Sequence, residues 1–396
     1  MARVIVALSG GVDSAVSAAL LQDAGHRVEG LFMSNWSEDD DAYCTSAADF
    51  QDARRVCDEL GIPLHKASFE ADYRSRVFAH FLAELEAGRT PNPDVLCNRE
   101  VKFGVGLAYA RRLGAERFAT GHYARIGAGG RLLRAVDLAK DQSYFLHALD
   151  ARQLAGCEFP VGGLCKPEVR AIARERGLPV ADKRDSTGIC FIGERPFGDF
   201  VGRWLPGRAG PIETEDGIVI GRHHGLERYT IGQRSGLGIG GRSDASGAPW
   251  FVAAKVLTRN ALIVVQGAGH PALHCSGLRA ADAHWISGRA PAVQFHCAAK
   301  VRYRQPDVEC RVTVDGGSLD IRFPAPVAGA APGQYVVLYD GEECLGGAVI
   351  MTAHPLEDSC RTASRPAASS MPVDAATTIT HSMPSASPTS DASRIR

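Results

Sequence analysis

The sequence has no long hydrophobic run and no excess of charge of one sign, and the first of these absences excludes a class of protein. No stretch of about 18 consecutive apolar residues occurs, which is what a membrane-spanning helix needs. The first predicted strand begins at Arg3, without the charged and then apolar leader of a secretory signal. We therefore expect a protein that has no contact with a membrane and is not secreted.

The charge and the cysteine content bear on the partners and on the cellular compartment of the protein. Lys and Arg number 44 against 45 Asp and Glu, so the net charge of −1 neither indicates nor excludes a nucleic-acid partner. Any RNA contact must then come from local basic patches. Eleven cysteines are scattered over the chain without the spacing of a small disulfide-rich domain. We expect free thiols, some of them reactive, in a reducing cytoplasm.

The length of 396 residues predicts two or three hydrophobic cores. Strand and helix patterns alternate at first, short glycine-rich β-like runs follow, and strands then recur at regular spacing. We predict an α/β domain over residues 1–200, a small central domain over 201–275 and a β-barrel domain over 276–356. Residues 357–396 are rich in Ser, Ala, Thr and Pro, and we predict a disordered tail because they cannot bury a core.

The chain is organised around Ser9-Gly-Gly-Val-Asp-Ser14, between a strand pattern over 3–8 and a helix pattern over 15–21. A helix start offers free backbone N–H groups and the positive end of the helix dipole, and glycines let an anion approach. Asp13 in such a loop suits a ligand of Mg²⁺ or of water. No lysine stands where the ordinary G-x-x-x-x-G-K-[ST] loop needs one, so a different phosphate loop is predicted.

SGGVDS after a strand and before a helix resembles the signature of the PP-loop ATP pyrophosphatases. The resemblance implies that the loop binds the pyrophosphate of ATP while a substrate is adenylated. A glycine pair alone would indicate only a tight turn. A second strand over 26–33, a helix over 47–60 and a strand over 117–120 continue the alternation. The predicted fold class is α/β, a doubly wound parallel sheet with ligands at the carboxyl ends of its strands.

Two cysteines lie in segments that favour chemistry. Residues 88–103 are predicted to form a stiff polar loop, because two prolines fix the backbone, and to lead into a helix over 104–112. Cys97, close to Lys102, is predicted to have a lowered thiol pKa and to be a nucleophile, although a single cysteine is more often a small buried hydrophobe. Cys190 lies between two nearby glycines, which indicates a closely approached backbone.

The β part of the chain offers one candidate RNA surface. Short β-like runs are predicted over 218–220 and 229–239, and a hairpin over 251–265. Residues 300–304 alternate, so Arg302 and Arg304 are predicted to share one strand face that suits phosphates and a stacked base. A plain solvated strand face is the commoner reading of such a pattern.

Several long motifs stand in the order found in bacterial tRNA-specific 2-thiouridylases, and the chain closely resembles that family over about residues 3–353. The motifs are Pro91-Asn-Pro-Asp-Val-Leu-Cys97, Gly121-His-Tyr-Ala-Arg125, Lys140-Asp-Gln-Ser-Tyr-Phe-Leu146, Ser186-Thr-Gly-Ile-Cys-Phe-Ile-Gly193, Tyr229-Thr-Ile-Gly-Gln-Arg234 and Pro332-Gly-Gln334. The resemblance implies a PP-loop ATP-binding catalytic domain, a central domain and a C-terminal β-barrel. It also implies transfer of sulfur to C2 of the wobble uridine in tRNAs for Lys, Glu and Gln.

Carried over position by position, the resemblance implies roles for single residues. The implied ATP contacts are Ala7, Leu8, Ser9, Gly10, Gly11, Val12, Asp13, Ser14, Met33 and Gly121. The implied contacts to the target base are Asn92, Pro93 and Asp94. Cys97 is implied to be the nucleophile, Cys190 the persulfide carrier and Asp94 the acid or base. The implied tRNA contacts are His122, Lys140, Asp141, Gln142, Arg302, Tyr303 and Gln334.

The chemistry of uracil is consistent with these roles. Its C2 oxygen leaves badly, so ATP first adenylates that oxygen and AMP departs when sulfur attacks. A persulfide on Cys190 would supply the sulfur, and Cys97 would resolve it and leave a disulfide. The base must leave its stack to reach such a site, and residues 92–94 suit the wall of the receiving pocket. We expect ATP with Mg²⁺, no metal held by the protein, and a cysteine desulfurase or a sulfur-relay protein as donor.

Two alternatives stay open at the level of sequence. A PP-loop ligase acting on a small molecule would need neither two active thiols nor β-domains for RNA. A non-catalytic RNA-binding protein that holds an iron–sulfur cluster on Cys97, Cys190 and Asp94 would account for the cysteines but not for the ATP loop, and a cluster is not favoured. Release of AMP and pyrophosphate separates these readings.

Overall fold

The computed structural model describes residues 1–36, 46–185, 197–239 and 247–356. The predicted tail and Cys190 lie outside these residues, so the predictions made for them are not addressed by the structure. The described residues belong to one compact unit. Within them, no helix combines the length and the apolar character that a membrane crossing requires.

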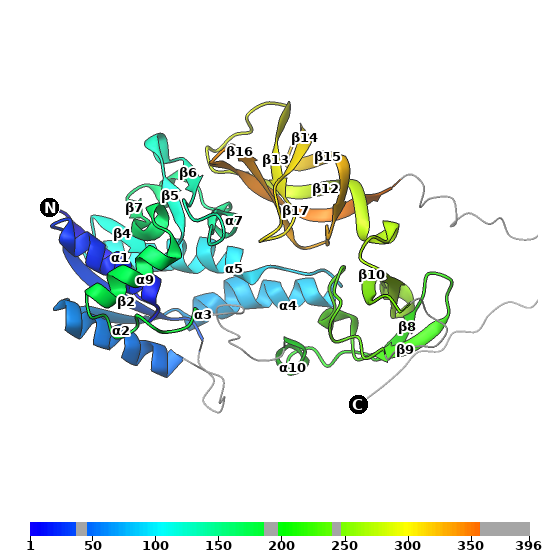
Figure 1. Ribbon diagram of the computed structural model, residues 1–396, viewed down its shortest axis with the longest axis horizontal. Helices are drawn as coiled ribbons and strands as arrows, with labels where there is room; N and C mark the ends of the chain where they lie inside the picture. The colour runs from blue at the N-terminus through cyan, green and yellow to red at the C-terminus, as the bar shows by residue number, and fades with distance from the viewer. Residues whose placement is uncertain (37–45, 186–196, 240–246, 357–396) are drawn as a thin grey trace, which may run out of the picture. The chain divides into compact units, whose positions relative to one another are not determined.

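Five parallel strands form the sheet of the first domain, in the order β3-β2-β1-β4-β7 (Figure 1). They are β1 (Arg3–Ala7), β2 (Arg27–Ser34), β3 (Leu64–Ser68), β4 (Arg117–Thr120) and β7 (Cys157–Glu158). The chain moves outward from β1 in one direction through β2 and in the other through β4. The carboxyl ends of β1 and β4 therefore flank the crevice where such sheets bind ligands. The prediction of a doubly wound parallel sheet is confirmed.

Both faces of this sheet are covered, because successive residues of a strand point to opposite sides. Val4 and Val6 of β1 join a hydrophobic cluster with α1 (Val12–Asp23) and α2 (Ser46–Leu60). Ile5 and Ala7 join another cluster with the helix that carries Cys97. Apart from the helical stretch over residues 93–112, the first domain also contains α3 (Glu70–Tyr73), η1 (Arg74–Phe78), α4 (Ala79–Glu86), β5 (Ala124–Ile126), η3 (Ala128–Gly130), β6 (Leu132–Arg134), α7 (Ser143–Leu146), α8 (Ala151–Leu154), η4 (Pro160–Gly163) and α9 (Lys166–Glu175).

The prediction of a loop over 88–103 is wrong from Pro93 onward. A continuous helical stretch runs through α5 (Pro93–Leu96), the π-helix η2 (Cys97–Gly106) and α6 (Leu107–Arg112). Asn92 is its N-cap, and its Oδ1 accepts a hydrogen bond from the Asp94 backbone N–H at 3.2 Å. Asparagine at the N-cap followed by proline is a helix-start pattern, so the second proline begins the helix instead of preventing it.

The central domain contains a four-stranded sheet in the order β10-β11-β8-β9, in which β11 and β8 run parallel. Its elements are α10 (Phe197–Gly202), β8 (Gly210–Glu213), β9 (Val219–His223), η5 (Leu226–Arg228), β10 (Trp250–Val256), η6 (Leu257–Arg259), β11 (Ala261–Gln266) and η7 (Pro271–Leu273). The predicted hairpin over 251–265 is present as β10 and β11. Residues 229–239 contain no strand, contrary to prediction.

The C-terminal strands close into a six-stranded barrel, because β12 pairs with both β15 and β17. The strands are β12 (His274–Trp285), β13 (Gln294–Lys300), β14 (Val308–Asp315), β15 (Ser318–Ala328), β16 (Tyr335–Asp340) and β17 (Glu343–Pro355). β6 of the first domain adds to β17, and β5 adds to β6. Strand β13 ends at Lys300 and Arg304 has a φ of 71°, so the predicted shared strand face of Arg302 and Arg304 does not exist.

Candidate active site

The turn between β1 and α1 presents backbone donors in the way that an anion needs. Helix α1 begins at Val12, and its N-cap is Gly11, which has no side chain to occupy the N–H groups of the first turn. Ser14 Oγ accepts from the Ser9 backbone N–H at 3.3 Å and donates to the Gly11 carbonyl oxygen at 3.1 Å. These contacts fix the shape of the loop and leave the first backbone N–H groups of α1 for the predicted anion.

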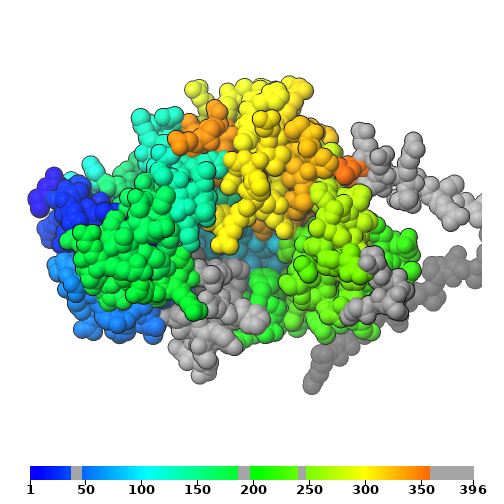
Figure 2. Space-filling view, viewed as in Figure 1, coloured from blue at the N-terminus to red at the C-terminus, as the bar shows by residue number. Residues whose placement is uncertain are grey.

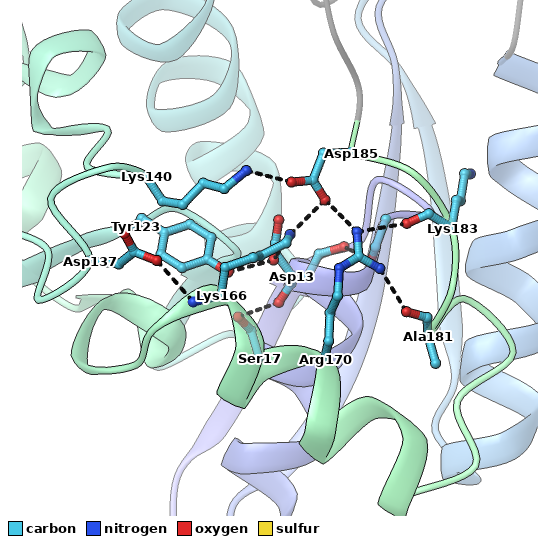
Figure 3. A network of polar contacts seen from close by, with 12 residues as sticks. Asp13, Ser17, Tyr123, Asp137, Lys140, Lys166, Arg170, Ala181, Lys183 and Asp185 are labelled. Carbon is cyan, nitrogen blue, oxygen red and sulfur yellow. Dashed lines mark hydrogen bonds and ion pairs between the residues drawn. The ribbon is translucent and has the colours of Figure 1, made fainter. Parts of the chain in front are cut away.

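Asp13 in this loop is held by two side chains from distant parts of the sequence (Figure 3). Its Oδ1 accepts from Lys166 Nζ at 2.6 Å and from the Tyr123 hydroxyl at 2.8 Å. Lys166 is the first residue of α9, and its side chain is only 10% exposed. The loop motif carries no lysine of its own, and helix α9 brings one to the same place.

A second carboxylate collects three cations next to Asp13 (Figure 3). Asp185 lies 2.6 Å from Lys140 Nζ, 2.8 Å from Lys166 Nζ and 2.9 Å from Arg170 Nη2. Burial alone would raise the pKa of Asp185, but the hydrogen bonds from Lys140 and Lys166 lower it to about 2. A third carboxylate, Asp137, accepts from the Lys166 backbone N–H at 2.9 Å, so three cations and three carboxylates gather beside the loop.

A further lysine connects the loop to α2. Lys183 Nζ donates to the Gly10 carbonyl oxygen at 3.0 Å and to the Asp49 and Asp52 carboxylates at 2.7 and 2.5 Å. Burial lowers the pKa of Lys183, but these carboxylates outweigh it and the net shift is upward. A surface cavity of about 340 Å³ is lined by Asp52, Arg55 and residues 178–183. In Figure 2 the green surface that follows α9 lies beside the blue surface of α2.

The structure places the other predicted ATP contacts around the same turn. A Cβ at Gly121 would lie 2.6 Å from the Ser14 backbone nitrogen, so only glycine lets the end of β4 pack on the loop. Met33 lies near the end of β2, two residues beyond Leu31, which pairs with Ala7. The loop and Gly121 are thus in contact, and Met33 stands at the neighbouring strand end.

Cys97 is the first residue of the π-helix and is 1% exposed. Burial raises the pKa of its thiol to about 11; the charge of Lys102 opposes this shift and that of Asp94 adds to it. The predicted lowering of the Cys97 pKa is therefore wrong for this structure. π-Helical turns are rare and recur at functional sites. Asn92 and Pro93 line a cavity of about 200 Å³ together with barrel residues.

The residues predicted to touch tRNA in the first domain have partners within the chain. His122 is half-buried, and desolvation together with the charge of Lys102 lowers its pKa well below the usual value. Gln142 Oε1 accepts from the Tyr123 backbone N–H at 2.9 Å. Asp141 is 4% exposed and accepts from two backbone N–H groups, at 3.0 and 3.2 Å. Lys140 is the member of this group that joins the cluster at Asp185.

The three predicted tRNA contacts of the barrel also have internal partners. The Arg302 guanidinium donates to the Ile231 carbonyl oxygen of the central domain. Gln334 Nε2 donates to the Thr90 carbonyl oxygen at 2.8 Å. The Tyr303 ring packs on the rings of residues 144–145, with centroids 4.4 Å apart for Phe145. Their roles toward tRNA stay predictions.

Sequence reasoning missed Lys166, Tyr123, Arg170, Lys183 and Asp185. One signal for Lys166 was available: a cation in the first turn of a helix faces the positive end of the helix dipole, so it indicates a nearby anion. Tyr123 carried no such signal, because its contact to Asp13 joins residues 110 positions apart. The partners of Asp185 are 15 to 45 positions away, and only the fold brings them to one place.

A doubly wound parallel sheet, an anion loop at its first strand-to-helix turn and converging cations define an α/β enzyme that uses a nucleotide. The three parts of the chain match three family models. These are described as the tRNA methyl transferase HUP domain over residues 2–194, the tRNA methyl transferase PRC-barrel domain over 198–266 and the aminomethyltransferase beta-barrel domain over 275–350.

Sequence similarity to known proteins extends over nearly the whole chain. A relative from Marinobacter nauticus, named tRNA-specific 2-thiouridylase MnmA, is 56% identical over 355 residues, which are 88% of this chain and 91% of the relative. A relative of the same name from Sodalis glossinidius is 55% identical over 360 residues, covering 89% and 98%. The chain belongs to the family of tRNA-specific 2-thiouridylases.

One similar solved structure is titled as a 4-thiouridine synthetase in complex with RNA and bound ATP. It is 17% identical and covers 49% of this chain and 46% of that chain, with a TM-score of 0.32. The similarity is too low to compare the two sites.

Proposed function

We propose that this chain is an ATP-dependent sulfurtransferase that replaces the C2 oxygen of the wobble uridine by sulfur in tRNAs for Lys, Glu and Gln. The observation that carries the proposal is the anion loop with Lys166 on Asp13, in a chain 56% identical to a 2-thiouridylase. The small-molecule ligase and the non-catalytic iron–sulfur protein are not favoured, because the similarity extends over all three domains.

The first step is adenylation of the C2 oxygen, in which pyrophosphate leaves ATP. The backbone N–H groups of the loop and the ammonium and guanidinium groups of Lys140, Lys166 and Arg170 would bind the phosphates, since each now contacts a carboxylate that a triphosphate can replace. The carboxylate of Asp13 would hold Mg²⁺, which offsets the charge that develops on the leaving pyrophosphate.

The second step forms the carbon–sulfur bond. The terminal sulfur of a persulfide on Cys190 attacks C2, and AMP leaves with the former C2 oxygen. The Cys97 thiolate then attacks the inner sulfur of Cys190, so a Cys97–Cys190 disulfide forms and the thiolated base is released. With a pKa of about 11, Cys97 enters this step protonated, and Asp94, three residues earlier on the same helix, would take the proton.

The test is mass spectrometry of tRNA nucleosides after incubation of the chain with ATP, Mg²⁺, unmodified tRNA, cysteine and a cysteine desulfurase. We expect 2-thiouridine at position 34 and none when ATP is omitted. The Cys97→Ser variant should accept sulfur on Cys190 yet form little product, whereas Cys190→Ser should accept none. Formation of 2-thiouridine without ATP, or an unchanged rate in both variants, would contradict the proposal.

A further inference from the structure

Thr90, in the short connection between α4 and α5, contacts both the central domain and the C-terminal barrel. Its backbone N–H donates to the Pro332 carbonyl oxygen at 2.8 Å, and its carbonyl oxygen accepts from Gln334 Nε2 at 2.8 Å. Its hydroxyl lies 3.4 Å from the Thr230 hydroxyl of the central domain. Every polar group of Thr90 is thus directed to a residue outside the domain that contains it.

Close packing supports these hydrogen bonds. Gly333, between the two barrel partners of Thr90, has a φ of +89°, and a Cβ there would lie 2.8 Å from the Thr90 nitrogen. Only glycine adopts this backbone conformation without strain and leaves this space. The barrel turn over 332–334 therefore approaches Thr90 as closely as the backbone allows.

The central domain adds a charged contact two residues earlier. Lys255 Nζ, on β10, donates to the Gly88 carbonyl oxygen at 3.1 Å. Burial lowers the pKa of Lys255 to about 8, against a small opposing effect of Glu227. Lys255 is half-buried, which costs part of its hydration, and its ammonium group contacts the backbone that leads to Thr90.

The held segment leads directly into the reacting helix. Pro91 and Pro93 on either side of Asn92 restrict its backbone, and Asn92 caps α5. A displacement of Thr90 is therefore expected to displace Asp94 and Cys97 as well. The Arg302 contact to Ile231 ties the barrel to the central domain next to Thr230, so the two domains that hold Thr90 are also tied to each other.

We propose that Lys255 and Gln334 are positioning residues, which hold the Gly88–Thr90 backbone and thereby keep Cys97 buried at the start of the π-helix until the C-terminal domains move. The effect on sulfur transfer rests on the proposed function, but the effect on the exposure of Cys97 does not. Neither residue touches a reacting atom in this account; both act through the Thr90 segment.

The experiment measures alkylation of Cys97 by iodoacetamide at pH 8, without tRNA or ATP, by peptide mass spectrometry. We expect Lys255→Met and Gln334→Glu each to raise the rate about tenfold, since each removes one hydrogen bond that holds the segment. Lys255→Met exchanges a half-buried cation for an apolar chain of similar length, so it is expected to fold. Arg222→Met, an exposed cation of the same sheet on β9, is the matched control and should leave the rate unchanged.

The rate of 2-thiouridine formation is measured on the same variants. We expect kcat to fall about tenfold in Lys255→Met, with tRNA affinity within twofold of the parent chain. Unchanged alkylation of Cys97 in both variants overturns the proposal, whatever the thiolation rate. If the variants show raised alkylation of Cys97 but the parent chain makes no 2-thiouridine, the positioning role is supported. The proposed function is then overturned instead.

Discussion

Lys166 places its ammonium group 2.6 Å from Asp13 and 2.8 Å from Asp185, inside a cluster where three cations meet three carboxylates. The loop motif is therefore completed by a residue 153 positions away in the sequence. A phosphate that displaces these carboxylates keeps the lysine and gains its charge. At the scale of the residue, the cations proposed to bind the phosphates are paired with the carboxylates of the chain itself.

The first prediction follows from this arrangement. Lys166→Met should lower the rate of tRNA-dependent pyrophosphate release about 100-fold, because one charge is lost where negative charge develops in the transition state. The measurement is release of labelled pyrophosphate from ATP at saturating tRNA. Arg174→Met removes an exposed cation from the same helix, which pairs with the exposed Asp182, and should have no effect. Equal rates in the two variants would remove Lys166 from the ATP site.

The second prediction concerns the protonation of Cys97. With its pKa raised to about 11 from an ordinary value near 9, the thiolate fraction at pH 8 is about 100-fold lower than for an ordinary thiol. Alkylation of Cys97 in the free protein should therefore rise with pH until about pH 11. Asp94→Asn should lower this midpoint because a negative charge is removed, and Lys102→Met should raise it. A midpoint below pH 9, or shifts of the same sign in both variants, would contradict this electrostatic account.

Single residues also show where sequence reasoning stops. The loop residues Ser9 to Ser14 and the candidate Cys97 could be singled out because their signals are local: glycines before a helix and a motif after a proline. The lowered pKa assigned to Cys97 was wrong because charge is visible in a sequence and burial is not. Burial depends on how the helix packs against the sheet, and here desolvation outweighs the nearby Lys102.

At the scale of the element, one carboxylate ties together three neighbouring strands. Glu29 on β2 is 3% exposed and accepts from Arg3 Nε on β1 at 2.8 Å and contacts His65 Nε2 on β3 at 2.8 Å. The hydrogen bond from Arg3 is the main cause that lowers the pKa of Glu29 to about 2; burial opposes it and His65 adds to it. The sheet order is thus reinforced at the strand starts, far from the ligand end.

The third prediction is the pH dependence of this contribution. Because the folded pKa is lower than the unfolded value of 4.5, the ionised Glu29 stabilises the fold above about pH 4.5, and this stability is lost as the pH falls toward 2. Glu29→Gln should cost about 2 kcal/mol at pH 7, after allowance for solvent screening of the partly exposed partners, and much less near pH 2. Urea unfolding at both pH values checks this. Glu175→Gln, on the exposed face of α9, is the control. A loss that stays constant with pH would contradict the ion-pair explanation.

The elements themselves were predicted unevenly, and for physical reasons. The first strands and helices follow from local periodicity, and so does the hairpin of β10 and β11. The stretch over 93–103 was misassigned because proline occurs both in stiff loops and at helix starts. The packing of the residues after Pro93 against the sheet decides between the two, and a local pattern does not reveal it. The strand expected over 300–304 fails because β13 ends at Lys300, where residues 301–305 turn and carry Arg302 to the central domain.

At the scale of the whole molecule, the domains share structure in ways that no local pattern indicates. Strand β6, within the first domain, pairs with β17 of the barrel through Leu132 and Leu133. Arg134 beside them is 5% exposed, lies 2.8 Å from Asp307 and stacks over the Tyr339 ring at 3.5 Å. The predicted domain boundaries stay predictions. The contacts at Thr90 and Arg134 nevertheless indicate that the barrel is a structural part of the catalytic unit.

For the whole molecule, the central proposal is that the loop and Lys166 bind ATP so that a tRNA uridine can be adenylated. The most direct measurement is release of pyrophosphate from ATP with and without tRNA, in the absence of any sulfur donor. The account predicts release only with tRNA, at about one pyrophosphate per tRNA, and at least 100-fold less in Asp13→Asn. Release of ADP and phosphate in place of pyrophosphate, or a rate in Asp13→Asn equal to that of the parent chain, would contradict it.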